Sequence, residues 1–148
     1  MGSDSTTGPF GPDPASARRA AEKVVHDYYA TVNAAIRTGD LSELEKSFLP
    51  TCSLCAREIA TYKAVFDAGS SVWGGLIVVN DARAVGVGQS NVITVHTSIT
   101  EGASAVVGKE GQVLKSFPAA TNPNLLFEVK ITATGRIVVA DVGQLATQ

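Results

Sequence analysis

The two cysteines of the chain, Cys52 and Cys55, are the residues whose type and spacing most clearly allow chemistry. Two intervening residues suit three kinds of site: a thioredoxin-type redox pair, half of a metal site, or a local disulfide. Pro50 precedes the pair and a helical stretch follows it from about Ser53. A helix N-terminus at this point lowers the pKa of a thiol, so the position alone does not choose between these sites.

The wider sequence favours the disulfide. A redox pair of the thioredoxin type needs a strand leading into the motif and a later βαβ unit, and the chain shows neither. A zinc site needs two further ligands, which His26 and His96 alone offer, and both occupy positions typical of solvent-facing residues. Free thiols, a metal pair and a redox pair remain the alternatives. We expect no metal and no cofactor.

A disulfide between these residues closes a short loop, which stabilises the fold by about 2 kcal/mol in the chain-entropy treatment. We therefore expect the disulfide to fix the chain locally, at the corner before the helical stretch. We do not expect it to hold the whole domain together. Disulfides persist in oxidising compartments, so the pair also predicts an exported, extracytoplasmic protein.

Composition predicts one folded domain. The chain has 148 residues, of which 45% are apolar and 18% charged, with a net charge of −2. The Lys and Arg residues do not suggest a concentrated basic face, so the sequence gives no support for nucleic-acid binding. Residues 1–14 are rich in Pro, Gly, Ser and Thr, which predicts a disordered linker or an added tail, with the single domain at 15–148. Met1-Gly2-Ser3 is typical of an added start, and we expect a natural leader before it.

Apolar periodicity predicts three helices ahead of the strands. The first begins after Asp13 and ends at Gly39, because apolar residues recur at three- and four-residue steps between them. A short second helix is expected from Leu41 to about Phe48, with Asp40 and Glu43 as a capping box. The third runs from about Ser53 to Ala68.

After Gly69 the period changes to two, which is typical of strands. Residues 108–111 predict a tight hairpin, and residues 125–133 alternate between a buried and a wet face. This order of helices and strands predicts an α+β fold, in which three N-terminal helices pack on one curved antiparallel sheet.

A resemblance supports that expectation. Tyr28-Tyr29, Val32-Asn33-Ala34, Thr38-Gly39-Asp40, Leu44 and Cys52-Ser53-Leu54-Cys55 resemble an uncharacterised family of actinobacterial cell-envelope lipoproteins. That family is similar to the cone-shaped nuclear transport factor 2-like superfamily, which includes ketosteroid isomerase and SnoaL. The resemblance implies a lipid anchor ahead of the linker. The family has paired glycines at the end of the third helix, whereas this chain has its pair later, at Gly74-Gly75.

The resemblance also implies a pocket that can hold a carboxylate base and hydrogen-bond donors. The residues expected to line it are Tyr29, Tyr62, Trp73 and Asp141. No catalytic constellation is recognisable among the other candidates, each of which is typical of a solvated or packed residue. These are Tyr28, Asp67, Asp81, His96 and Glu128.

The expected function is therefore a non-catalytic binding or assembly module, exported and tethered to the membrane by an N-terminal lipid anchor. Its expected partner is a small molecule or an envelope protein, and a homodimer through the wet sheet face is a further expectation. The alternative is a small-molecule enzyme of the isomerase, cyclase or hydrolase type, which uses a pocket carboxylate. Fold alone does not decide between them, because function belongs to sites.

Overall fold

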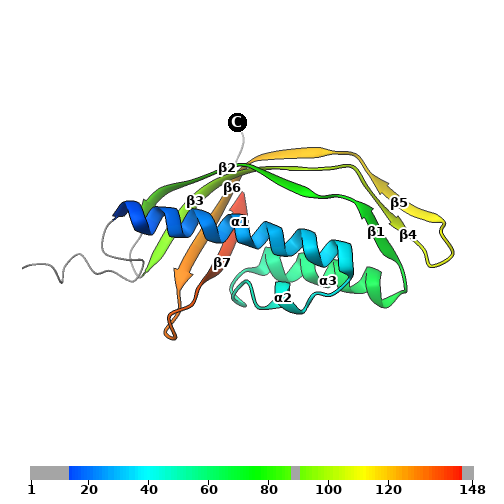
Figure 1. The fold of residues 1–148 in the computed structure, drawn as a ribbon, viewed down its shortest axis with the longest axis horizontal. Coiled ribbons are helices and arrows are strands. Elements are labelled where there is room, and N and C mark those ends of the chain that lie inside the picture. The colour runs from blue at the N-terminus through cyan, green and yellow to red at the C-terminus, as the bar shows by residue number, and fades with distance from the viewer. Residues whose placement is uncertain (1–13, 88–90, 145–148) are drawn as a thin grey trace, which may run out of the picture.

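The computed structural model describes residues 14–87 and 91–144. One long helix opens the described part of the chain, and a single helical turn, a second full helix and the strands follow it (Figure 1). The predicted linker lies outside the described residues except for Pro14, where α1 begins. The elements are α1 (Pro14–Thr38), α2 (Ser42–Glu45), α3 (Ser53–Asp67), β1 (Ser71–Gly74), β2 (Ile77–Val87), β3 (Val92–Glu101), β4 (Ser104–Val107), β5 (Val113–Phe117), β6 (Ala120–Ile131) and β7 (Ile137–Gln144).

The strands of the described chain form two antiparallel sheets. The larger has the order β2-β3-β6-β7, and the smaller has the order β1-β4-β5. The expectation of an α+β cone with three helices on one curved sheet is therefore wrong. The structure has one long N-terminal helix and two separate sheets, and the expected second helix is only the four-residue α2.

Glycines explain why the predicted single sheet divides in two. Gly74 and Gly75 separate β1 from β2 and have φ angles of +73° and +76°, which interrupt the extended backbone. Gly102 lies in the corresponding break between β3 and β4. Backbone hydrogen bonds join the two breaks, from Gly102 to Leu76 and from Gly75 to Ala103. The smaller sheet consequently turns toward the helices at one end of the molecule (Figure 1).

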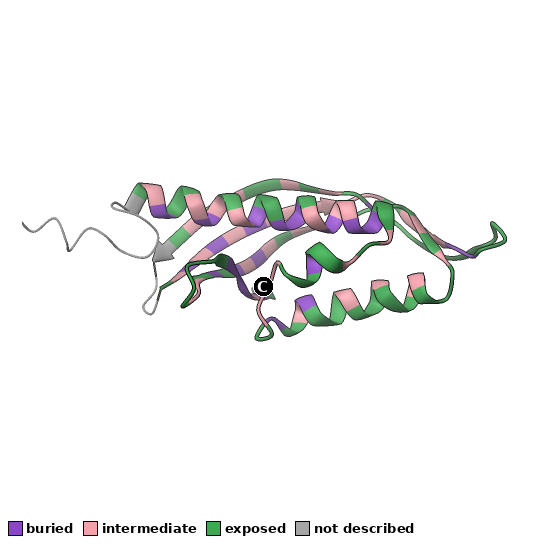
Figure 2. Ribbon diagram, turned by 60° about the horizontal axis from the view of Figure 1, so that its bottom comes forward, coloured by how far each residue is buried: buried purple, intermediate pink, exposed green. Residues whose placement is uncertain are grey.

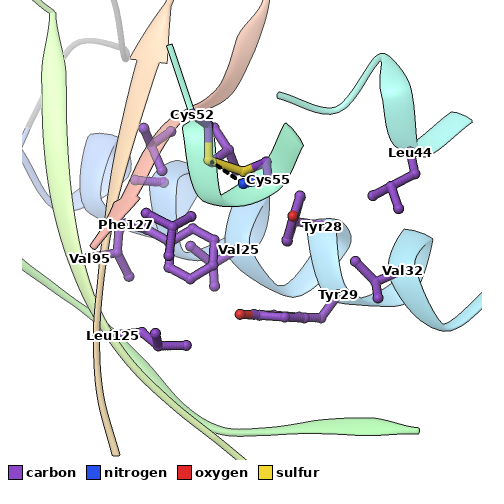
Figure 3. Packing of buried hydrophobic residues seen from close by; sticks show 14 of the residues in the cluster. Val25, Tyr28, Tyr29, Val32, Leu44, Cys52, Cys55, Val95, Leu125 and Phe127 are labelled. Atoms are coloured by element: carbon purple, nitrogen blue, oxygen red, sulfur yellow. Dashed lines mark hydrogen bonds between the residues drawn. A yellow bond between two sulfur atoms is a disulfide. The ribbon is translucent and has the colours of Figure 1, made fainter. Parts of the chain in front are cut away.

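α1 supplies most of the helical side of the core. Its buried residues face the larger sheet, where Val25 and Phe127 are fully buried (Figures 2 and 3). Tyr28 and Tyr29 pack edge-on against Phe127, with ring centroids 5.7 and 5.6 Å from it. α3, in contrast, buries only Cys55 and leaves most of its surface exposed (Figure 2). α3 is thus attached to the rest of the fold mainly through its first turn.

Two polar side chains fasten α1 to β2. The side-chain amide of Asn33 donates to the carbonyl oxygen of Ile77 at 2.9 Å and accepts from its N–H at 2.8 Å. Glu22 accepts from the N–H of Ala84 at 2.8 Å, beside an irregularity in the strand pairing. Asn33 thus bridges two elements that are 44 positions apart in the sequence.

We expect Asn33→Ala to lower the free energy of unfolding by about 1–2 kcal/mol, because two part-buried backbone groups lose their partner. Urea denaturation measures the effect. Thr31→Ala is the control, since the Thr31 hydroxyl bonds to the carbonyl of Asp27 within its own helix. Equal stability of the two variants would show that the Asn33 bridge contributes nothing.

The segment before α3 covers the outer edge of β7. The N–H of Leu49 donates to the carbonyl of Val139 at 2.8 Å, and the Thr51 hydroxyl donates to the carbonyl of Ala140 at 2.6 Å. The guanidinium of Arg136 donates to the carbonyl of Lys46. These contacts explain why α2 ends so early: its following residues pair with a strand in place of continuing a helix.

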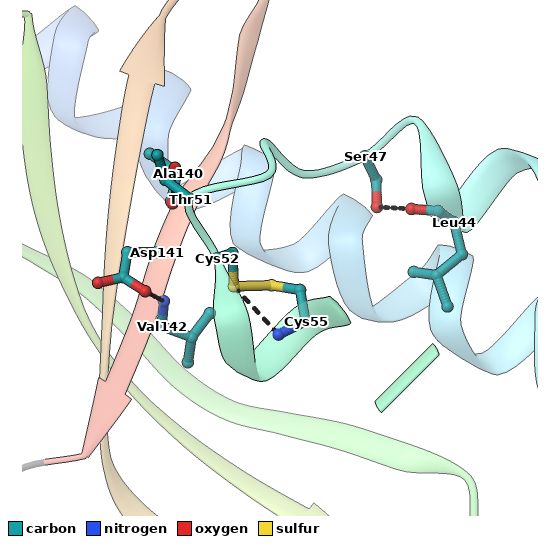
Figure 4. The surroundings of a disulfide bond; sticks show 8 residues. All are labelled: Leu44, Ser47, Thr51, Cys52, Cys55, Ala140, Asp141 and Val142. Atoms are coloured by element: carbon teal, nitrogen blue, oxygen red, sulfur yellow. Dashed lines mark hydrogen bonds between the residues drawn. A yellow bond between two sulfur atoms is a disulfide. The ribbon is translucent and has the colours of Figure 1, made fainter. Parts of the chain in front are cut away.

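The predicted disulfide is confirmed. Cys52 and Cys55 are bonded, and both are buried against β7 (Figure 4). Cys52 is also the N-cap of α3, and its sulfur accepts from the N–H of Cys55 at 3.2 Å. The bond lies at the expected corner before α3, and both of its cysteines are packed in the core. Such a bond is typical of oxidising compartments.

None of the helices in the described residues is long and apolar enough to cross a membrane.

Candidate functional site: an apolar groove beside α3

A groove of about 800 Å³ lies between α3 and the smaller sheet. Its walls are mainly apolar, and this volume is within the range that small-molecule pockets occupy. The bend at Gly74-Gly75 creates the space, because it brings the smaller sheet round to face α3. The principal apolar lining residues are Ile36, Val65, Val72, Val106, Leu114 and Phe117.

A smaller chamber of about 370 Å³ adjoins the groove and reaches the core. Glu58, Tyr62, Glu101 and Ala120 line both spaces, so these residues mark the boundary between them. The inner chamber extends to Tyr28 and Tyr29 on α1 and to Leu125 on β6. The site is thus a groove with a narrower inner end beside the aromatic core.

Two carboxylates lie at this boundary, one from α3 and one from the end of β3. Burial raises the pKa of Glu58, and the nearby charge of Glu101 raises it further, although Arg57 acts in the opposite direction. Burial likewise raises the pKa of Glu101. Glu58 is exposed and Glu101 is half-buried, so solvent screens both carboxylates and these shifts in pKa are small. Within the described chain neither carboxylate has an ion-pair or hydrogen-bond partner.

Three tyrosines surround the same boundary. Burial raises the pKa of Tyr62 to about 12, and Glu101 and Glu58 add to the shift. Burial also raises the pKa values of Tyr28 and Tyr29, again with Glu58 contributing. Tyr28 is 4% exposed and Tyr29 is 7% exposed. Neither hydroxyl has a hydrogen-bond partner among the described residues, although both side chains line the inner chamber.

The structure brings together two of the four residues expected to line a pocket. Tyr29 lines the inner chamber, and Tyr62 lines both spaces. Trp73 lies outside the groove lining and is 63% exposed on β1. Asp141 is half-buried on β7 and lines neither the groove nor the inner chamber. Its carboxylate accepts from the N–H of Val142 at 3.0 Å (Figure 4).

The remaining candidates lie elsewhere. His26, Asp81 and Glu128 are exposed, and Asp67 pairs with Lys63 at 3.1 Å. His96 is half-buried, with Nε2 3.4 Å from Asn124 Oδ1 and a buried Nδ1 that has no partner in the described chain. Within residues 14–87 and 91–144, no three potential ligand side chains are placed to hold a metal ion.

Sequence reasoning missed Glu58 and Glu101. Glu58 occurs one position before Ile59, within the predicted third helix, and so reads as an ordinary exposed helix charge. Glu101 is the last residue of β3, next to Gly102. Gly102 was the available signal, because a glycine in a strand often marks a bend or a site where a ligand or another backbone approaches closely.

Comparison with known proteins identifies a fold and no family. No protein-family model matches the sequence, and no curated protein matches it. The structure is similar to the intermembrane-space region of the chloroplast protein ARC6, with a TM-score of 0.62 and 12% identity over 88% of this chain and 97% of that one. At this identity the likeness shows a shared fold only.

Two structures from Catenulispora acidiphila align less well. One is in complex with S-DNPA and has a TM-score of 0.49 at 11% identity, covering 85% of this chain and 92% of that one. The other has a TM-score of 0.48 at 13% identity, with the same coverage of 85% and 92%. These scores are too low to support any conclusion about the groove.

Proposed function

We propose that this protein is an exported, non-catalytic binding module whose groove holds a small apolar ligand. The observation that carries the proposal is the mainly apolar groove between α3 and the smaller sheet, about 800 Å³ in volume. Apolar walls with a few polar groups at one end are characteristic of ligand pockets. The disulfide supports the exported part of the proposal.

The proposal includes a lipid anchor ahead of residues 1–14. Its support is the tether-like composition of those residues and the resemblance to envelope lipoproteins. Detergent phase partitioning of the full natural protein from its source cells tests this part. Partition into the detergent phase that a lipase abolishes is the expected result, and partition into the aqueous phase of untreated protein would exclude the anchor.

The groove itself is tested by filling it. Val106→Trp adds a large side chain to the lining, and we expect it to weaken binding of the neutral apolar dye Nile red by about tenfold, which corresponds to about 1.4 kcal/mol. Fluorescence titration measures the affinity. Val78→Trp is the matched control, because Val78 is 59% exposed on β2 and lies outside the groove lining.

Equal affinity of the two tryptophan variants for Nile red would contradict the groove as the ligand site. Circular dichroism of both variants establishes that each is folded before the affinities are compared.

An enzyme that uses a groove carboxylate is the second candidate. The observation in its favour is the raised pKa of Glu58 and Glu101 beside Tyr62, since perturbed groups in clefts are frequent catalytic residues. The binding module remains our preference, because no hydrogen bond in the described chain joins these carboxylates to Tyr62 or to another donor. An assembled acid–base pair would need that contact.

A further inference from the structure

We propose that the groove selects small amphiphilic cations, whose ammonium group lies between Glu58, Glu101 and the tyrosine hydroxyls while the apolar body occupies the groove. This inference rests on the proposed binding function and specifies its ligand class. It follows from three observations about the boundary between the two spaces.

The first observation is the pair of unpartnered carboxylates. Glu58 and Glu101 come from different elements and converge on the boundary. In the described chain the ion pairs are Lys23–Asp27, Lys46–Glu43 and Lys63–Asp67, which lie elsewhere. Two like charges near an apolar wall destabilise each other, and a cation placed between them relieves both the repulsion and the desolvation.

The second observation is independent of the carboxylates. Tyr28 and Tyr29 are more than nine-tenths buried and line the inner chamber, yet their hydroxyls lack hydrogen-bond partners in the described residues. Neither hydroxyl oxygen is fully enclosed, so a ligand in the chamber can reach both and supply the missing hydrogen bond. Tyrosine oxygens accept hydrogen bonds from an ammonium group, whose three N–H groups need acceptors.

The third observation concerns the cations already near the groove. Lys115 lines it, but its ammonium lies 5.2 Å from the ring centroid of Phe117 and so packs on that ring. Arg57 acts on Glu58 only as a neighbouring charge, and no ion pair joins the two. The protein's own cations therefore leave the carboxylates available. The size of the groove suits a small molecule with a short apolar body.

Three matched ligands test the inference: octylammonium, 1-octanol and octanoate, which share an apolar body and differ in charge. Each displaces Nile red from the full chain at neutral pH, and fluorescence reports its affinity. We expect octylammonium to bind about tenfold more tightly than octanol, and octanoate to bind most weakly. Raising the salt concentration narrows these differences, because part of the site is open to solvent.

The isosteric double variant Glu58→Gln/Glu101→Gln assigns the preference to the two carboxylates. We expect it to bind octanol as the wild type does while its preference for octylammonium falls to about twofold or less. The control is Glu43→Gln/Glu45→Gln, which changes the net charge equally at two exposed residues of α2. It should keep the full preference.

The preference for octylammonium over octanol should also become smaller as the pH is lowered. Because the folded protein holds the pKa values of Glu58 and Glu101 above the usual glutamate value, these groups become neutral at a milder acidity than ordinary carboxylates. The other charged or titratable groups facing them are Tyr28, Tyr29, Tyr62, Arg57 and Lys115. Burial raises the pKa values of the three tyrosines, so these hydroxyls stay neutral as the pH falls.

The outcomes separate the two proposals. If octanol and octylammonium bind the wild type equally, or if the α2 control loses the preference as fully as the groove variant, the inference about cations is overturned and the apolar groove stands. If neither Nile red nor any octyl ligand binds the wild type, both proposals fail.

Discussion

Replacing Cys52 and Cys55 together with alanine is expected to lower the free energy of unfolding by about 3 kcal/mol. Loss of the short covalent loop accounts for about 2 kcal/mol of this in the chain-entropy treatment. The remainder comes from the two buried sulfur atoms, which leave unfilled space against β7. For a chain of this size the change lowers the melting temperature by roughly 6–12 °C.

Thermal unfolding followed by circular dichroism measures this effect. The same experiment with a thiol reductant is the control, because reduction should destabilise the wild type and leave the double variant unchanged. A loss below about 1 kcal/mol in the double variant would mean that packing around the first turn of α3 compensates for the bond. We also expect weaker Nile red binding, since α3 forms one wall of the groove.

Gly74→Ala is expected to lower the free energy of unfolding by about 2–4 kcal/mol. The positive φ of +73° disfavours a side chain. In addition, a Cβ atom at this position would lie 2.3 Å from the carbonyl oxygen of Ala103, so the backbone must shift. Such overpacking costs about 1–3 kcal/mol beyond the backbone strain. The shift alters the bend that forms the groove, so ligand affinity should fall as well.

Gly143→Ala is the matched control for this variant. A Cβ atom at Gly143 meets nothing within 4 Å, so its stability should lie within about 0.5 kcal/mol of the wild type. Urea denaturation of both variants gives the comparison. Equal stability of the two variants would show that the bend tolerates a side chain.

The sequence contained enough information for the local elements. The apolar period of the first helix predicted its extent, and α1 ends at Thr38, just before Gly39. The hairpin around residues 108–111 was predicted from its glycines and joins β4 to β5. These features depend on neighbouring residues only. The disulfide was also predictable, because a spacing of two residues permits it in many backbones.

The architecture and the groove were not predictable in the same way. The division into two sheets depends on the bends at Gly74-Gly75 and Gly102 lying side by side in neighbouring strands. No local sequence pattern reveals that the two bends are neighbours. Glu58 and Glu101 are 43 positions apart in sequence (101 minus 58), and only the folded arrangement of α3 and β3 places them along the same space. The role of Asn33 likewise has no local signal, because its partner is a backbone 44 positions away.

The contacts that fasten α1 and the segment before α3 to the larger sheet have a consequence for self-association. Outer strands with free N–H and C=O groups recruit strands of other copies and start aggregates. Here Asn33 and Glu22 occupy backbone groups along β2, and residues 48–51 occupy those along β7. Both edges of the larger sheet thus have some of their backbone groups occupied. In the smaller sheet, β5 is an outer strand that is exposed along its whole length, so a strand of a second copy can pair with it.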